Sequence, residues 1–159
     1  MTKSIFLVLC AVVFTSFAAL SAQAQTSRKS VPASEVNGTF QMDFKGKFKG
    51  SSNEIKILAL GKGRLQIAMD LLYPYIVRGE MSANMGQLDG EAKIEGDTAV
   101  YESTEFGQCR ITIKFVQPGT IKVSQEGTDA DCGFGHNVMA DGTYRRVSSA
   151  KPTFEPRDQ

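Results

Sequence analysis

The feature that most constrains the fold of this chain is an alternation of apolar and polar residues with a period of two. Ile111, Ile113 and Phe115, for example, are separated by single polar residues. The same pattern occurs in residues 40–44, 65–71, 88–94 and 121–124, and more weakly in residues 55–60, 98–103 and 139–147. Because successive side chains of a strand point to opposite faces, this period predicts strands with one buried and one solvated face, as in antiparallel sheets.

Short turn signals separate these segments. They are Gly50-Ser51-Ser52-Asn53, Gly61-Lys62-Gly63, Glu95-Gly96-Asp97 and Pro118-Gly119. Such residues favour chain reversal, and most connections are too short for a crossover helix, so neighbouring strands should pair as hairpins. We predict an all-β fold, a single antiparallel meander of about eight strands that forms a closed or nearly closed lipocalin-like barrel. A β-sandwich is the alternative.

Residues 71–86 do not fit this pattern, because they form a long link that is unusually apolar for a loop. Pro74 lies within it and disfavours a central strand. One interpretation is a lid or contact surface at the mouth of the barrel. The other, which we favour, is a folded-back segment or extra strand that plugs the end of the barrel.

Residues 1–24 have the layout of an export signal. Lys3 gives a positive start, Ile5–Leu20 is almost entirely apolar, and Ala22-Gln23-Ala24 matches the small-x-small pattern before a cleavage site. The apolar run is shorter than the roughly 20 residues that a membrane-spanning helix needs. We therefore expect a cleaved signal peptide, no transmembrane anchor, and a periplasmic or secreted protein.

The remaining chain reads as one domain between two polar ends. Residues 25–36 are expected to be a flexible leader, residues 37–147 the β-barrel domain, and residues 148–159 a flexible tail. The 18 Lys and Arg less Lys3 leave 17, against 17 Asp and Glu, so the mature chain is nearly neutral. This balance argues against a nucleic-acid partner, and a hydrophobic fraction of 42% argues against a disordered chain.

Cys109 and Cys132 are the two cysteines that remain after the signal is removed. An even pair in an exported protein predicts a disulfide, which would close a loop of about two dozen residues and contribute roughly 3 kcal/mol. A metal site is the weaker alternative, because it would need more ligands than these two cysteines and the distant His136. We expect no metal and no cofactor.

The last third of the chain carries a more particular pattern. The strand-like segment from Cys109 to Phe115 and a second over residues 121–127 precede Cys132-Gly133-Phe134-Gly135 and Asp141-Gly142-Thr143-Tyr144. With residues 88–101, this resembles a group of small, mostly uncharacterised bacterial exported domains, similar to periplasmic lysozyme-inhibitor modules. The resemblance covers about residues 87–146 and implies an antiparallel barrel with one disulfide. Known inhibitors insert loop residues into the acidic cleft of lysozyme, but no loop here aligns with theirs, so no inhibitory residue is carried over.

Four residues are candidates for contacting a partner. Phe134 and His136 lie in a glycine-rich turn after Cys132, and Tyr73 and Tyr75 lie in the apolar link. The structural alternatives are that Phe134 caps the barrel and that His136 is an ordinary loop histidine. The tyrosines, with Tyr101 and Tyr144, could instead line a ligand cavity.

No pattern in the sequence supports catalysis. No nucleophile motif surrounds any serine, and His136 is the single histidine. We therefore expect a non-enzymatic, exported binding protein of the bacterial envelope, such as a lysozyme-inhibitor-like or accessory factor. Its partner would be an envelope protein or a cell-wall component. The alternative is a lipocalin-like carrier of a small hydrophobic ligand.

Overall fold

The structure, a computed structural model, describes residues 30–154. The expected export signal and residues 25–29 of the expected leader lie outside the described residues. Within the described range the chain forms eight β-strands, one short α-helix and two 3-10 turns. In chain order these are α1 (Ala33–Val36), β1 (Gly38–Asp43), η1 (Gly46–Phe48), β2 (Ser52–Gly61), β3 (Arg64–Val77), β4 (Glu80–Glu95), β5 (Thr98–Ser103), β6 (Cys109–Gln117), β7 (Thr120–Glu126), η2 (Ala130–Cys132) and β8 (Gly142–Ser148).

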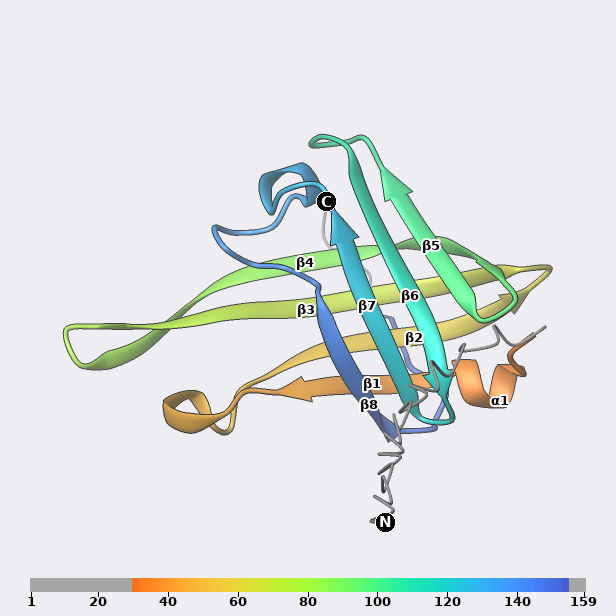
Figure 1. Cartoon of the computed structure of the whole chain (residues 1–159), viewed down its shortest axis with the longest axis horizontal. Coiled ribbons are helices and arrows are strands. Elements are labelled where there is room, and N and C mark those ends of the chain that lie inside the picture. The colour runs from red at the N-terminus through yellow and green to blue at the C-terminus, as the bar shows by residue number, and fades with distance from the viewer. Residues whose placement is uncertain (1–29, 155–159) are drawn as a thin grey trace, which may run out of the picture.

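The strands form a closed barrel in which each strand pairs with its neighbours in the chain and β8 returns to pair with β1 (Figure 1). Every pairing is antiparallel. The prediction of an all-β meander of eight strands closed into a barrel is confirmed, and the alternative of a sandwich is excluded. Closure pairs β1 with β8, so the first and last strands of the meander are not left as open edges.

The interior of the barrel holds one hydrophobic core built from the alternating residues. In β6, Ile111 and Ile113 are fully buried, while Arg110 on the opposite face is exposed. The other large side chains with almost no exposure are Val36, Phe40, Ile55, Ile57, Leu65, Ile67, Met69, Leu71, Ile121 and Tyr144. The period of two in the sequence is therefore the pattern of burial in the structure.

The boundary of the expected leader needs correction. Residues 33–36 form α1, and Val36 is only 2% exposed because it packs into the core. Two hydrogen bonds fix this end of the domain, one from the Ala59 amide to the Asn37 side chain at 2.7 Å and one from Arg146 to the Ser34 carbonyl at 2.7 Å. The folded domain thus begins before residue 37.

The apolar link at residues 71–86 also needs correction, because it is neither a loop nor a separate strand. It continues β3 and β4, which pair without interruption from Arg64↔Lys93 to Val77↔Glu80. Arg78 and Gly79 form the turn, with φ of 51° and 87°, and a two-residue turn of this kind matches the twist of a hairpin. The long hairpin extends beyond the barrel wall at the end opposite to α1 (Figure 1).

The expected flexible tail lies partly against the barrel. After β8, Thr153 and Phe154 line a surface hollow together with Ala68 and Gln87 on the outside of β3 and β4. Phe154 is half-buried there. The last described residues of the tail therefore lie against the barrel wall.

Among residues 30–154, no helix is both long enough and apolar enough to cross a bilayer.

Candidate functional site

The part of the long hairpin that projects from the barrel, residues 72–85, is called the arm. The pairing of β2 with β3 ends at Glu54↔Asp70, and β4 pairs with β5 only over residues 93–95. Within residues 30–154, the arm therefore has no further strand on either side. A two-stranded ribbon without covering strands leaves most of its side chains accessible, although Pro74 is buried and Leu72 half-buried.

The register of β3 with β4 gives the two faces of the arm different compositions. Paired residues share a face, so the outer face carries Leu72, Pro74, Ile76, Met81, Ala83 and Met85. The inner face continues the barrel interior from Leu71 and carries Tyr73, Tyr75, Val77, Glu80, Ser82 and Asn84. The outer face is therefore entirely apolar, whereas the inner face combines aromatic and polar side chains.

Large apolar side chains of the arm are unusually exposed. Tyr73 is 42% exposed, Met81 59% and Met85 61%, and Ile76 and Val77 are exposed as well. Scattered apolar side chains on a surface are ordinary, but a contiguous group on one projecting element is typical of a contact surface. The arm is thus the main candidate for an interaction site in the described chain.

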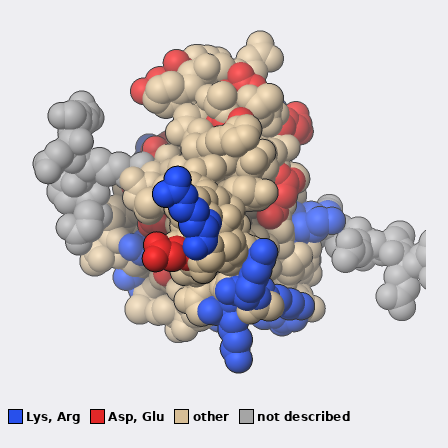
Figure 2. Space-filling model, turned by 90° about the vertical axis from the view of Figure 1, so that its left-hand side faces the viewer, with Lys and Arg blue, Asp and Glu red and all other residues tan. Residues whose placement is uncertain are grey.

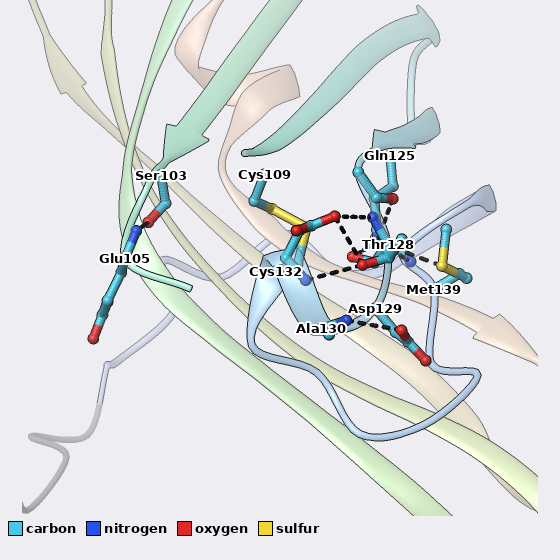
Figure 3. The surroundings of a disulfide bond; sticks show 12 residues. Ser103, Glu105, Cys109, Gln125, Thr128, Asp129, Ala130, Cys132 and Met139 are labelled. Atoms are coloured by element: carbon cyan, nitrogen blue, oxygen red, sulfur yellow. Dashed lines mark hydrogen bonds between the residues drawn. A yellow bond between two sulfur atoms is a disulfide. The ribbon is translucent and has the colours of Figure 1, made fainter. Parts of the chain in front are cut away.

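The connection between β7 and β8, residues 127–141, is called the mouth loop. Figure 3 shows how it is held: the Cys109–Cys132 disulfide joins it to the start of β6, which confirms the predicted pairing. Gln125 donates to the Thr128 carbonyl at 3.1 Å and accepts from the Ala140 amide at 2.9 Å. These bonds fix both ends of the loop, so its shape is set without regular secondary structure.

Two carboxylates stabilise the first turn of the mouth loop. Asp131 accepts from the Thr128 amide at 2.7 Å and from the Thr128 hydroxyl at 2.8 Å, and these bonds lower the pKa of its carboxyl group. Asp129 accepts from the amides of Asn137 at 2.5 Å and Ala130 at 2.8 Å, which lower the pKa of Asp129. Hydrogen bonds to a carboxylate favour its charged form, so both groups are anions at neutral pH.

The mouth loop rests on the base of the arm. The Gly135 amide donates to the Met85 carbonyl at 2.9 Å, and the Asn84 side chain donates to the His136 carbonyl at 2.7 Å. Gly86 allows this contact, because a Cβ atom there would lie 2.7 Å from Val138 and 2.8 Å from Phe134. The loop and the inner face of the arm therefore form one continuous surface at this end of the barrel.

The structure brings three of the four predicted partner-binding residues to this surface. Tyr73 is exposed and Tyr75 half-buried on the inner face, and the His136 side chain is 82% exposed with Nδ1 3.7 Å from Asp129. Phe134 is different: it is 6% exposed and packs against Gly86, as the interpretation of a barrel cap predicts. Its side chain is therefore part of the core.

The arm lies between two loops of opposite charge. The loop after β1 carries Lys45, Lys47 and Lys49, all exposed, on one side of the arm, and the mouth loop lies on the other (Figure 1). Figure 2, which views the molecule from the arm side, shows basic side chains gathered toward the bottom and acidic side chains toward the top. This separation of positive and negative charge makes the arm-side surface dipolar, and a dipolar surface can orient a charged partner.

Two of the tyrosines, Tyr101 and Tyr144, pack into the interior of the barrel. Tyr144 is fully buried, and its hydroxyl donates to the Ala140 carbonyl at 2.9 Å. Tyr101 fills the space beside Gly90, where a Cβ atom would lie 2.5 Å from its ring. Three surface hollows among residues 30–154, with volumes of about 620, 570 and 250 Å³, are lined mainly by loop residues and outward-facing side chains.

Across the described range, His, Cys, Asp and Glu nowhere gather in a group of three or more that could hold a metal ion. The sequence reasoning missed Asn84, Met81 and Met85 as contributors to the site. The dipeptide Arg78-Gly79 was the available signal, because it is a hairpin turn sequence within the apolar link.

Fold and site together define this protein as a closed eight-stranded antiparallel barrel with one disulfide and a projecting hairpin. Comparisons with protein-family models, with curated proteins and with solved structures found no match to this chain.

Proposed function

We propose that this protein is an exported, non-enzymatic binding protein of the bacterial envelope that recognises another protein through its arm and mouth loop. The observation that carries the proposal is the arm, a projecting hairpin with exposed aromatic and aliphatic side chains. Tyr and Met are enriched at protein interfaces, and Tyr buries a large apolar area at a small cost in conformational entropy.

The disulfide supports the exported location. Disulfides persist in oxidising compartments such as the periplasm and the extracellular space. This agrees with the export signal expected over residues 1–24.

The filled barrel favours a protein partner over the carrier role. Phe40, Leu65 and Met69 are at most 1% exposed and occupy the interior where a lipocalin-like carrier would hold its ligand. A ligand would have to displace several such side chains, each of which contributes about 1.5–3 kcal/mol by its burial.

The test is photocrosslinking in the protein's own host, with a benzophenone amino acid placed at single positions. We expect a discrete protein adduct from Tyr73 and none from Leu60, an apolar residue of similar exposure on β2 near the opposite end of the barrel (Figure 1). Adducts from both positions, or from neither, would contradict recognition through the arm.

Native mass spectrometry of the protein from the same host separates the two candidate functions. A clean protein mass is expected. An additional mass of a few hundred daltons that is lost on gentle activation would instead support the carrier role. Animal-type lysozyme is the first purified partner to titrate, because of the resemblance to lysozyme-inhibitor modules.

A direct titration can then assign the binding residues. For any partner bound, Tyr73→Ala should weaken affinity by about tenfold or more, as expected for a buried aromatic contact. Leu60→Ala is the matched control, because Leu60 is 41% exposed but lies on β2, outside the arm and the mouth loop.

A further inference from the structure

One edge of the arm offers unpaired backbone groups to another strand. The Met85 carbonyl accepts from Gly135, so the backbone groups of Met85 point away from β3. In an antiparallel strand, the groups of alternate residues point to the same side, so those of Met81 and Ala83 also point outward. No strand of the described chain pairs with them, because β5 meets β4 only at residues 93–95.

The opposite edge of the arm is closed to pairing. The Leu72 amide donates to the Asn53 side chain at 2.8 Å, so Leu72, Pro74 and Ile76 direct their backbone groups away from β4. Pro74 has no N–H group and interrupts the row of donors in its middle. Proline at an outward position is a common device that protects an exposed edge. The β4 edge of the arm, residues 80–85, has no such proline.

The free edge is short and has defined limits. The turn at Arg78 and Gly79 ends it on one side, and Gly135 occupies the edge at Met85 on the other. Between these two limits lie residues 80–84, with two outward-pointing residues, Met81 and Ala83. Residues 87–92 of β4 also have no strand paired on this side, but they lie beyond Gly135 and are not continuous with this edge. A strand that pairs here must therefore be short and free at its own end, as the tip of another arm is.

The segment is complementary to a second copy of itself. If two β4 edges pair antiparallel about Ser82, Met81 lies opposite Ala83 of the partner subunit, and each pair exchanges two backbone hydrogen bonds. The pairs of Met81 with Ala83 on the outer face are then apolar. The two copies of Ser82, which lie on the two-fold axis, are small and polar. This is an isologous contact, in which one patch meets itself around a two-fold axis.

The charges agree with this arrangement. Antiparallel arms place the tip of each beside the base of the other. Arg78 is exposed at the tip, and the mouth loop with the anionic Asp129 lies at the base, where His136 contacts Asn84. Each Arg78 would therefore approach an acidic loop of the partner subunit.

We propose that two copies of this chain associate through the β4 edges of their arms and form a four-stranded antiparallel sheet. The inner faces with Tyr73 and Tyr75 stay on one side of this sheet, and the apolar outer faces join on the other. The pairing is independent of the envelope partner, so it stands or falls separately from the proposed function. The contact is small, and we expect a dimer that dissociates on dilution.

Sedimentation velocity of the mature protein over a hundredfold range of concentration tests the proposal. The wild type should shift from monomer to dimer. Met81→Lys places a charge at the centre of the edge, and Ala83→Pro removes an outward N–H group that β3 does not use; both should remain monomeric. Val147→Lys is the matched control, because Val147 is 57% exposed on β8, and it should dimerise like the wild type.

Cross-linking tests the two-fold register. In the proposed sheet, the two copies of Ser82 form a non-hydrogen-bonded pair with Cα atoms about 4.5 Å apart, close enough for a disulfide. Ser82→Cys should therefore give a covalent dimer under mild oxidation, while Val147→Cys should not. A monomer at every concentration, or a dimer that Met81→Lys and Ala83→Pro leave intact, would overturn the proposal.

A second pair of variants tests the charge contact. Arg78→Glu should weaken the dimer several-fold at low salt. Lys62→Glu should not, although Lys62 is also an exposed cation in a hairpin turn, with φ of 53° against 51° for Arg78. Equal weakening by both variants would show that net charge, and not the contact of tip with mouth loop, governs association.

Discussion

The side-chain amide of Asn84 donates a hydrogen bond of 2.7 Å to the backbone carbonyl of His136, although the two residues are 52 positions apart. Asn84 belongs to the arm and His136 to the mouth loop, so this bond joins the two parts of the candidate site. A second hydrogen bond, from the Gly135 amide to the Met85 carbonyl, also holds the mouth loop against the arm. Together they set where the exposed histidine lies relative to the tyrosines.

The first prediction concerns this bond. Asn84→Ala should release the mouth loop from the arm, because a hydrogen bond of this kind contributes about 1 kcal/mol. Hydrogen exchange of the amides at residues 135–138 should accelerate about fivefold. Gln87→Ala is the control, since it removes a side-chain bond to Asp70 from the outer face of the same strand. Equal exchange in the two variants would argue against Asn84 as the anchor.

The second prediction concerns the close packing at Gly86. Gly86→Ala places a methyl group within 2.8 Å of Phe134 and Val138, and this overpacking should cost about 1–3 kcal/mol. The cost should appear as a lower midpoint in urea. Ser82→Ala, on the exposed part of the same strand, should change the midpoint little. A stable Gly86→Ala protein would mean that the loop can move away from the arm at no cost.

The third prediction concerns the disulfide. Cys109 and Cys132 are separated by 23 positions, and a loop of this size corresponds to roughly 3 kcal/mol in the chain-entropy model. The Cys109→Ser/Cys132→Ser double variant should lose about that much stability in denaturant. Addition of a reductant should lower the midpoint of the wild type and leave that of the double variant unchanged. Two free thiols in the unreduced wild type would refute the pairing itself.

The fourth prediction concerns acid. The amide and hydroxyl of Thr128 lower the pKa of Asp131 in the folded protein, so its contribution to stability is present above the pKa of the unfolded chain, about 4. That contribution is lost as the pH falls through the lowered value. Asp131→Asn should therefore melt at a lower temperature than the wild type at pH 7, and the difference should shrink in acid. A difference in melting temperature that stays constant from pH 7 into acid would contradict this assignment.

The fifth prediction concerns alkali. Burial raises the pKa of Tyr144 to about 12, so its contribution to stability is complete below about pH 10 and is lost as the pH rises through the raised value. Tyr144→Phe should cost about 1–3 kcal/mol at pH 8, because the buried Ala140 carbonyl loses its partner. The gap between the two proteins should narrow toward pH 12. A constant gap would mean that ionisation of Tyr144 does not affect folding.

Much of the fold could be predicted from neighbouring residues. The alternation in residues 110–115 predicted β6, and Pro118-Gly119 predicted the turn before β7. The barrel and the single disulfide follow from eight short strands and one cysteine pair. For Phe134 the favoured interpretation was a cap on the barrel, and it is buried against Gly86.

The candidate site could be predicted only in part. Tyr73, Tyr75 and His136 were named for their types and their local sequence, without any indication that they lie on one surface. The arm was expected to be a plug or a lid because Pro74 argues against a central strand. In the structure Pro74 lies in β3 beyond the last residue paired with β2, where the strand has become an edge and needs no donor on that side.

The sequence by itself determined what depends on adjacent residues: strand period, turn chemistry and the cysteine pair. These properties act over a few residues, so they can be recognised without knowing the rest of the chain. Tertiary structure alone decided where β2 and β5 stop pairing with β3 and β4, and hence that residues 72–85 project from the barrel. It also decided that the mouth loop rests on Gly86 and Asn84. Those outcomes depend on the relative lengths of strands distant in sequence and on the shape of the space between them, which no local pattern encodes.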